Sequence, residues 1–200
     1  MAPTSAIKDA FERNQYDLAT AAKKSRSWFE QEVMKITRQQ LTPPKILKGN
    51  PTEITQKVLP GYLYMYLYDP KTKADLPYYD RFPLVFPFRK TTDGFIGLNM
   101  HYLPYNFRIL LLDRLMIFAN NKRIDETTRL KYSWQLIDGV SRYQMAKPCI
   151  KQYLSSHVKS QFRRIPSNNW ATAMLLPVER FVGGSKQEVF ADSLKIARKR

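Results

Sequence analysis

Residues 60–70, "PGYLYMYLYDP", carry the clearest structural pattern in the chain. A tyrosine occupies every second position from Tyr62 to Tyr68, and aliphatic residues fill the positions between them. Successive side chains of a β-strand point to opposite faces, so the tyrosines share one face and the aliphatic residues share the other. Both faces are therefore apolar. This pattern predicts a strand that is covered on both sides, or one that lies at an interface.

Two more strands follow. "FPLVFPF", residues 82–88, is predicted to be an edge strand. Pro83 and Pro87 have no backbone N–H to donate to a neighbouring strand, and an edge strand has a neighbour on one side only. The hairpin turn "RKTTDG" connects it to a third strand over residues 95–100. We therefore expect a small antiparallel sheet over residues 60–101, with an SH3-like barrel as one form that it could take.

After the sheet, the apolar period becomes helical. We expect helices through residues 104–180, the first over residues 104–121 and the next beginning after Asp125 as its N-cap. In "KPCIKQYLSSHVKSQFRR", residues 147–164, the apolar residues form one stripe at helical spacing. The predicted fold class is α+β, with the sheet flanked by N-terminal and C-terminal helices.

The chain divides at a proline-rich segment. Residues 1–58 are predicted to be a helical N-terminal extension and a connector, since apolar residues recur at helical spacing between Trp28 and Ile36. Residues 59–200 are predicted to be the core domain, which ends in a basic tail over residues 186–200.

The charge points to a polyanion. The net charge is +16, from 33 Lys and Arg against 17 Asp and Glu, and a fold does not need this excess. We expect double-stranded DNA as the partner, although a merely basic surface would give the same count. No apolar run is long enough to cross a bilayer, and residues 1–20 do not resemble a secretory signal, so we expect no membrane partner. One cysteine, Cys149, fits a reducing compartment.

Half of the excess charge lies in the last quarter of the chain. Residues 147–200 hold eleven Lys or Arg against three acidic residues, a surplus of eight. On a helix over residues 147–164, the basic residues would lie opposite the apolar stripe, as on a surface that follows phosphates. A solvated helix face is the alternative. The candidate nucleic-acid-binding residues are Lys147, Lys151, Lys159, Arg163, Arg164, Arg198, Lys199 and Arg200.

His101 is the one residue that invites an enzymatic interpretation. Cys149 could be a nucleophile, with Asn99 or Asp80 orienting the histidine. No complete catalytic constellation accompanies these residues in the sequence. We therefore predict that His101 ends the third strand and that the protein is not an enzyme.

The sequence also lacks a recognisable metal or cofactor motif. Two histidines and one cysteine form no CxxC, HxxxH or HExxH pattern, and the glycines form no phosphate-binding loop. A magnesium-dependent nuclease needs clustered carboxylates. Asp69, Asp75, Asp80 and Asp93 do lie near one another in the predicted β region, but three of them are in loop or turn sequence. Aspartate is common in turns, so we predict no metal and no cofactor, and the nuclease is the least favoured alternative.

The blocks "YYDRFPLVFP" and "GLNMHYLP", followed by "KPCIKQYLSSHVKSQF" and "WATAMLLPVERF", carry a resemblance. The chain is similar, over roughly residues 25–195, to a family of virion-associated proteins of T4-like tailed phages, especially marine ones. Some members of that family are labelled DNA end protectors. The resemblance implies no catalytic residue, and it implies a protein that binds DNA ends or lies in the head–tail path.

Two functions are therefore expected from different classes. The first is a non-enzymatic virion protein that binds DNA, with DNA ends as the finer expectation. The alternative is a structural subunit of the phage neck or baseplate whose basic surface contacts acidic neighbouring subunits. Both imply other phage structural proteins as partners, and both imply the virion, with the host cytoplasm during assembly, as the location. Whether the protein is a homo-oligomer is left open.

Overall fold

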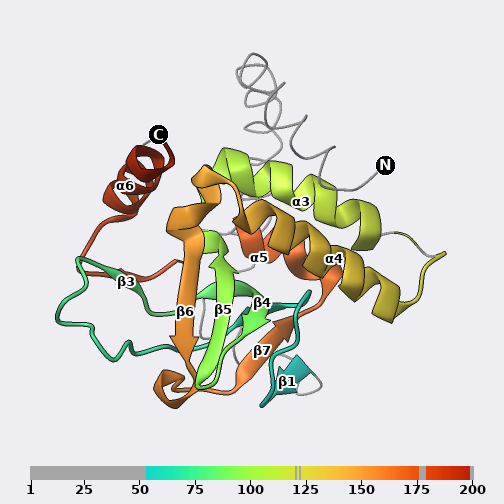
Figure 1. Ribbon diagram of the computed structural model, residues 1–200, viewed down its shortest axis with the longest axis horizontal. Coiled ribbons are helices and arrows are strands. Elements are labelled where there is room, and N and C mark those ends of the chain that lie inside the picture. The colour runs from blue at the N-terminus through green and yellow to red at the C-terminus, as the bar shows by residue number, and fades with distance from the viewer. Residues whose placement is uncertain (1–52, 120, 122, 176–178, 199–200) are drawn as a thin grey trace.

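The computed structural model describes residues 53–119, 121, 123–175 and 179–198 (Figure 1). The predicted N-terminal helices and most of the connector fall in residues 1–52, outside the described residues, and the division of the chain at that connector stays a prediction. The described part contains a six-stranded antiparallel sheet, a two-stranded sheet and α-helices. The α+β class is confirmed.

The large sheet has the order β1-β7-β2-β4-β5-β6, and every pair in it is antiparallel. The outer strands β1 and β6 do not pair with each other in the described chain, so this sheet does not close into the barrel that we considered. Its strands are β1 (Ile54–Thr55), β2 (Leu63–Met65), β4 (Leu84–Lys90), β5 (Gly94–Asn99), β6 (Ile150–Leu154) and β7 (Phe162–Ile165). The small sheet pairs β3 (Tyr79–Asp80) with β8 (Phe181–Val182).

Helices α3 (Tyr105–Ala119) and α4 (Glu126–Ser141) confirm the two helices predicted after the sheet. Asp125 is the N-cap of α4, because its carboxylate accepts a hydrogen bond from the Thr128 backbone N–H at 2.8 Å. The other α-helices are α5 (Trp170–Leu175) and α6 (Lys186–Arg198). Short 3-10 helices cover Met100–Tyr102, Gln144–Cys149, Ser155–His157 and Ser167–Asn169.

Figure 1 shows α3, α4 and α5 gathered on one side of the sheet. Helix α6 packs against the 3-10 helix Gln144–Cys149. Two indoles fix the helix layer on the sheet. Trp134 of α4 donates from Nε1 to the Phe88 carbonyl at 2.9 Å, and the Trp170 ring meets the Phe86 ring edge-on at 5.1 Å. The helices thus cover one face of the sheet and leave its opposite face to other side chains.

Of the strand predicted within residues 60–70, only Leu63–Met65 form β2, but the segment is covered on both faces as its alternation predicts. Leu63 and Met65 are fully buried in the main core beneath the helices. Tyr64, Tyr66 and Tyr68 are buried on the other face, in a second cluster with Val85, Phe95, Tyr153 and Phe162. Edge-to-face contacts such as Tyr66 with Phe162, whose ring centroids are 4.9 Å apart, hold this aromatic cluster together.

The prediction of an edge strand at residues 82–88 is wrong. Strand β4 lies inside the sheet, between β2 and β5. Pro83 precedes the strand, and the β4–β5 register shifts between Pro87 and Arg89. The residue without a β5 partner is Phe88, whereas Pro87 is in register with Gly97. Strand β2 pairs with β4 only at Leu84 and Val85, so Pro87 lies beyond the part of β4 that has partners on both sides.

The prediction of a helix over residues 147–164 is also wrong. The segment forms β6 and β7, which pair with β5 and with β2, and two 3-10 helices flank β6. The spacing of its apolar residues is compatible with a helix and with a strand. Residues 150–154 form a strand because each of them pairs with β5. The sheet therefore extends beyond residues 60–101, and the range predicted as helical, 104–180, contains two of its strands. Within the predicted basic tail, residues 186–198 form helix α6, and the last two residues lie outside the described residues.

Candidate nucleic-acid interface

The basic residues expected on one helix face are spread over several elements. Lys147 belongs to a 3-10 helix, Lys151 to β6 and Lys159 to the segment before β7, while Arg163 and Arg164 are neighbours in β7. Because neighbours on a strand point to opposite faces, the last two cannot act on the same surface. The structure therefore does not bring these candidates together as one surface.

Their surroundings also differ. Arg163 is only 1% exposed, and its Nη1 lies 3.5 Å from the Glu53 carboxylate, which joins β7 to the segment before β1. The Arg164 guanidinium lies 5.0 Å from the centroid of the Tyr62 ring. Lys147, Lys159 and Arg198 are exposed, and Lys199 and Arg200 lie outside the described residues.

A basic groove that the sequence did not reveal lies at the hairpin end of the sheet. Its volume is 550 Å³, and it is lined by three exposed cations, Lys57, Arg89 and Lys90, together with Phe95 and Phe162. None of the described residues that line it carries a carboxylate. The three cations also form no ion pair within the described part of the chain. They are therefore available to an external anion such as phosphate.

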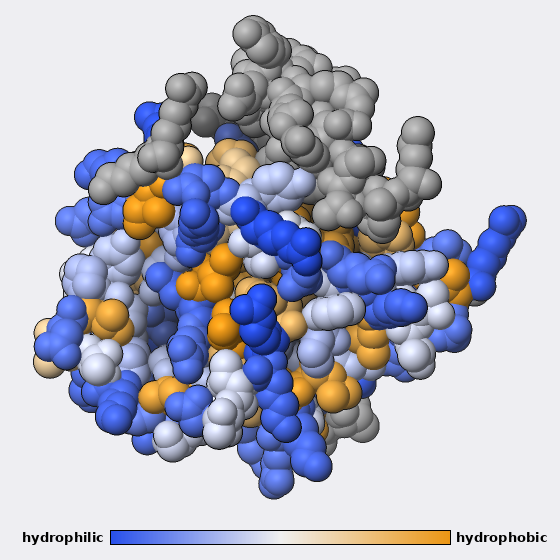
Figure 2. Space-filling model, viewed as in Figure 1, coloured by the Kyte–Doolittle hydropathy of each residue, from blue (hydrophilic) through white to orange (hydrophobic). Residues whose placement is uncertain are grey.

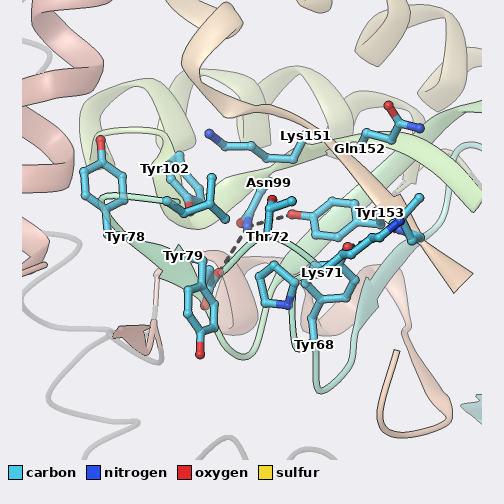
Figure 3. Close-up of a pocket in the computed structure, with 14 residues that line it drawn as sticks. Tyr68, Lys71, Thr72, Tyr78, Tyr79, Asn99, Tyr102, Lys151, Gln152 and Tyr153 are labelled. Carbon is cyan, nitrogen blue, oxygen red and sulfur yellow. Dashed lines mark hydrogen bonds between the residues drawn. The ribbon is translucent and has the colours of Figure 1, made fainter. Parts of the chain in front are cut away.

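A second hollow lies between the loop of residues 70–79 and strand β6, where the surface is recessed in Figure 2. Its volume is 360 Å³. We call it the tyrosine pocket, because five tyrosines line it (Figure 3). These are Tyr68, Tyr78, Tyr79, Tyr102 and Tyr153. Lys71 and Lys151 also line it, so it combines aromatic walls with two cations.

The base of the tyrosine pocket is a hydrogen-bonded polar network. Asn99 donates from Nδ2 to the Asp80 carboxylate at 3.1 Å and to the Tyr153 hydroxyl at 3.0 Å, and dashed lines mark both bonds in Figure 3. His101 Nδ1 lies 2.7 Å from Asp80 Oδ2, and the His101 backbone N–H donates to Asn99 Oδ1 at 2.9 Å. His101 is fully buried in the 3-10 helix Met100–Tyr102 between β5 and α3, so the third strand ends two residues earlier, at Asn99, and not at His101 as predicted.

The environment of Cys149 does not favour a Cys/His enzyme. The side chain is fully buried, and burial raises the pKa of the thiol to about 12. Reactive cysteines have a depressed pKa, so this thiol stays protonated and unreactive. No group of three or more His, Cys, Asp or Glu side chains in the described ranges is arranged to hold a metal ion.

A second buried ionic cluster joins α3 to the C-terminal segment. Arg108 is fully buried, and its guanidinium donates to the carbonyls of Leu103, His101 and Met174 at 2.6, 2.9 and 3.1 Å. Glu179 Oε1 lies 3.9 Å from Arg108 Nη2 and 2.6 Å from Lys186 Nζ.

The charges around Glu179 control its ionisation. Burial alone would raise the pKa of its carboxyl group, but the charges of Arg108, His101 and Lys186 outweigh burial and lower the pKa to about 2. The cluster therefore stays ionised, and through the His101 carbonyl it supports the turn beneath the tyrosine pocket.

The fold and these surfaces define a basic α+β protein whose exposed cations suit a polyanionic partner. The chain belongs to the phage T4 terminal DNA protecting protein family, whose model matches residues 5–198. This confirms the resemblance to T4-like phage proteins that the sequence blocks carry. Neither a curated protein nor a solved structure matches the chain. Within the described residues, none of the helices has the length and apolar character to cross a membrane.

Proposed function

We propose that this phage protein binds the ends of double-stranded DNA and protects them by occupying them, without catalysing a reaction. The family is described as one of terminal DNA protecting proteins, and the match runs over nearly the whole chain. The observation that carries the proposal is the basic groove, where Lys57, Arg89 and Lys90 face solvent and no carboxylate competes for them among the described lining residues. Its action takes place in the virion and, during assembly, in the host cytoplasm.

Phosphate contacts at the groove fit the charge of the chain. Each cation that neutralises a DNA phosphate releases a counterion, so affinity falls with salt by a slope of about −0.9 per contact. Three groove contacts therefore give a slope of about −2.7, which is roughly a 40-fold loss of affinity between about 50 and 200 mM salt. The exposed residues Lys147, Lys159 and Arg198 add to the attraction at longer range.

The proposal is tested by comparing linear and covalently closed circular duplex DNA of the same sequence, each at about 50 and 200 mM salt. End binding predicts a preference for the linear form that persists at the higher salt. Salt-sensitive binding to both forms alike would reduce the function to generic phosphate contact. Binding to neither form would favour the alternative, a neck or baseplate subunit that contacts acidic neighbouring proteins.

The groove itself is tested with the triple variant Lys57→Ala, Arg89→Ala and Lys90→Ala. We expect weaker binding to both DNA forms and a salt slope reduced by about three, because three phosphate contacts are removed. Fluorescence anisotropy titrations at several salt concentrations measure both quantities.

A matched control removes the same charge from other sites. Lys73, Arg142 and Lys195 each pair with an acidic residue three or four positions earlier in the chain, at 3.0, 2.7 and 3.4 Å. Their joint replacement by alanine should change the salt slope by less than one. If the control and the groove variant lose affinity equally, the groove is not the binding surface.

A further inference from the structure

The basic groove leaves the tyrosine pocket unexplained. The pocket lies between the loop of residues 70–79 and β6, whereas the groove lies at the β4–β5 hairpin. In Figure 3, Tyr78 and Tyr79 lie on one side of the pocket and Tyr68 and Tyr153 on the other, with Lys151 across the top. This is a concave, mostly aromatic site with a few polar groups, the usual composition of a ligand-binding pocket.

The two lysines that lie over tyrosine rings differ in one respect. Lys186 Nζ lies 4.3 Å from the centroid of the Tyr105 ring and is paired with the Glu179 carboxylate at 2.6 Å. Lys151 Nζ lies 4.1 Å from the centroid of the Tyr102 ring, but it forms no ion pair or hydrogen bond with any described residue. Both lysines therefore lie over a tyrosine ring, but only Lys186 has a carboxylate partner.

The Lys151 ammonium group is partly desolvated and has no anionic partner among the described residues, so a bound anion would stabilise its charge. Lys151 is partly buried, and burial lowers the pKa of its ammonium group because desolvation disfavours the charged form. The carboxylate that lines the same pocket, Asp80, is engaged by His101, by Asn99 and by the Phe82 backbone N–H. An anionic group that enters the pocket would therefore find the Lys151 ammonium free and the Asp80 carboxylate already satisfied.

The size of the pocket limits the ligand. Its 360 Å³ lies near the lower end of the range for small-ligand sites, about 300 to 1,000 Å³. A single nucleotide fits this range, but a duplex, whose major groove alone is about 12 Å wide, does not. Tyrosine rings stack on any base, because every base has an aromatic face. The Asn99–Asp80–His101 network holds the base of the pocket in place before a ligand arrives, which lowers the entropic cost of binding.

We propose that the tyrosine pocket receives the terminal nucleotide of a DNA strand, with its phosphate at Lys151 and its base among the tyrosine rings. This inference rests on the proposed function and supplies its selectivity. An internal nucleotide must be extruded from the stack on both sides before it can enter a pocket, whereas a terminal nucleotide has a neighbour on one side only. The pocket therefore favours ends over internal sites without reading a base sequence.

The test uses the full chain and two DNA molecules of the same stem sequence. One is a hairpin with a single 5′-phosphorylated free end, and the other is a dumbbell closed by a loop at both ends. We expect the wild-type protein to bind the open hairpin at least tenfold more tightly than the dumbbell. The variant Lys151→Met should lose that preference and keep its dumbbell affinity within twofold. Removal of the 5′-phosphate from the hairpin should reduce the wild-type preference as well.

A matched control is Lys73→Met. Lys73 belongs to the same loop but does not line the pocket, and it is paired with Asp69 at 3.0 Å. It should retain the wild-type preference, and thermal unfolding should show that both variants are folded. A Lys151→Met protein that still prefers the open hairpin like the wild type would overturn the pocket proposal and leave end binding intact.

A second measurement separates the two proposals. Titration with a 5′-phosphorylated dinucleotide, followed by tyrosine fluorescence, tests the pocket without a duplex. Saturable binding that Lys151→Met abolishes supports the pocket, even if the wild-type protein shows no preference for DNA ends and the proposed function fails. Absence of dinucleotide binding, together with an end preference that Lys151→Met retains, refutes the pocket alone.

Discussion

The buried cluster around Glu179 gives the most quantitative prediction about stability. The Glu179 side chain is 3% exposed, and its pKa is lowered from 4.5 to about 2 by Arg108, His101 and Lys186 against the opposing effect of burial. Lowering the pKa from 4.5 to about 2 corresponds to about 3 kcal/mol of folding free energy at pH 7. We expect Glu179→Gln to lower the free energy of unfolding by about that amount, because Glu179 is the only carboxylate of the described residues within ion-pair distance of the fully buried Arg108.

The pH dependence of this effect has a definite sign. The folded-state pKa of Glu179 is below the unfolded value, so its stabilisation is complete above about pH 5 and is lost as the pH falls from about 4.5 toward 2. Urea unfolding at pH 7 and at steps down to pH 3 should show the difference between wild type and Glu179→Gln shrinking. The exposed pair of Asp69 with Lys73 is the control, and Asp69→Asn should cost about 0–1 kcal/mol. A Glu179→Gln effect below about 1 kcal/mol at pH 7, or one that does not change with pH, would refute the reasoning.

Three further predictions concern the residues that support the sheet and the tyrosine pocket. His101→Ala should lower the free energy of unfolding by roughly 2 kcal/mol, since the buried Asp80 carboxylate loses a partner at 2.7 Å; loss of a chemical activity at unchanged stability would contradict this structural role. Cys149 should react with a thiol reagent only after denaturant is added, and rapid labelling of the native protein would contradict its burial. Gly94→Ala should destabilise by about 1–3 kcal/mol, because its Cβ would lie 1.9 Å from the Tyr153 carbonyl oxygen; an unchanged melting temperature would show that the β5–β6 pairing is looser than described.

The parts of the fold that the sequence predicts depend on local signals. The alternation around Tyr64 defines a doubly covered strand, because the period of two is visible within eight residues. The N-cap at Asp125 is equally local and is confirmed by its hydrogen bond to Thr128.

The parts that the sequence does not predict depend on pairing between distant segments. Residues 147–164 carry apolar side chains at spacings that also suit a helix. Strand β6 forms there because it pairs with β5, and this pairing cannot be read from the local sequence. The central position of β4 depends on its pairing with both β2 and β5, and the two prolines at this strand obscured that position in the sequence. Pro87 lies beyond the part of β4 that pairs on both sides, so the proline does not exclude a central position for the strand.

The candidate site shows the same limit. Lys151 is a candidate on a helix face by sequence, and the structure puts it in the tyrosine pocket through its place on β6. The basic groove combines Lys57 of the connector with Arg89 and Lys90 of the hairpin, and no spacing along the chain connects them. Charge counting therefore indicates the kind of partner but not the surface that meets it.

The central claim is that this protein protects DNA by occupying its ends. Its most direct test is the degradation of an end-labelled linear duplex by a processive exonuclease, with and without saturating protein, beside digestion of the same duplex by an endonuclease that cuts at an internal site. Occupied ends predict strong inhibition of the exonuclease and near-normal internal cutting. Equal inhibition of both enzymes, or of neither, would contradict end protection.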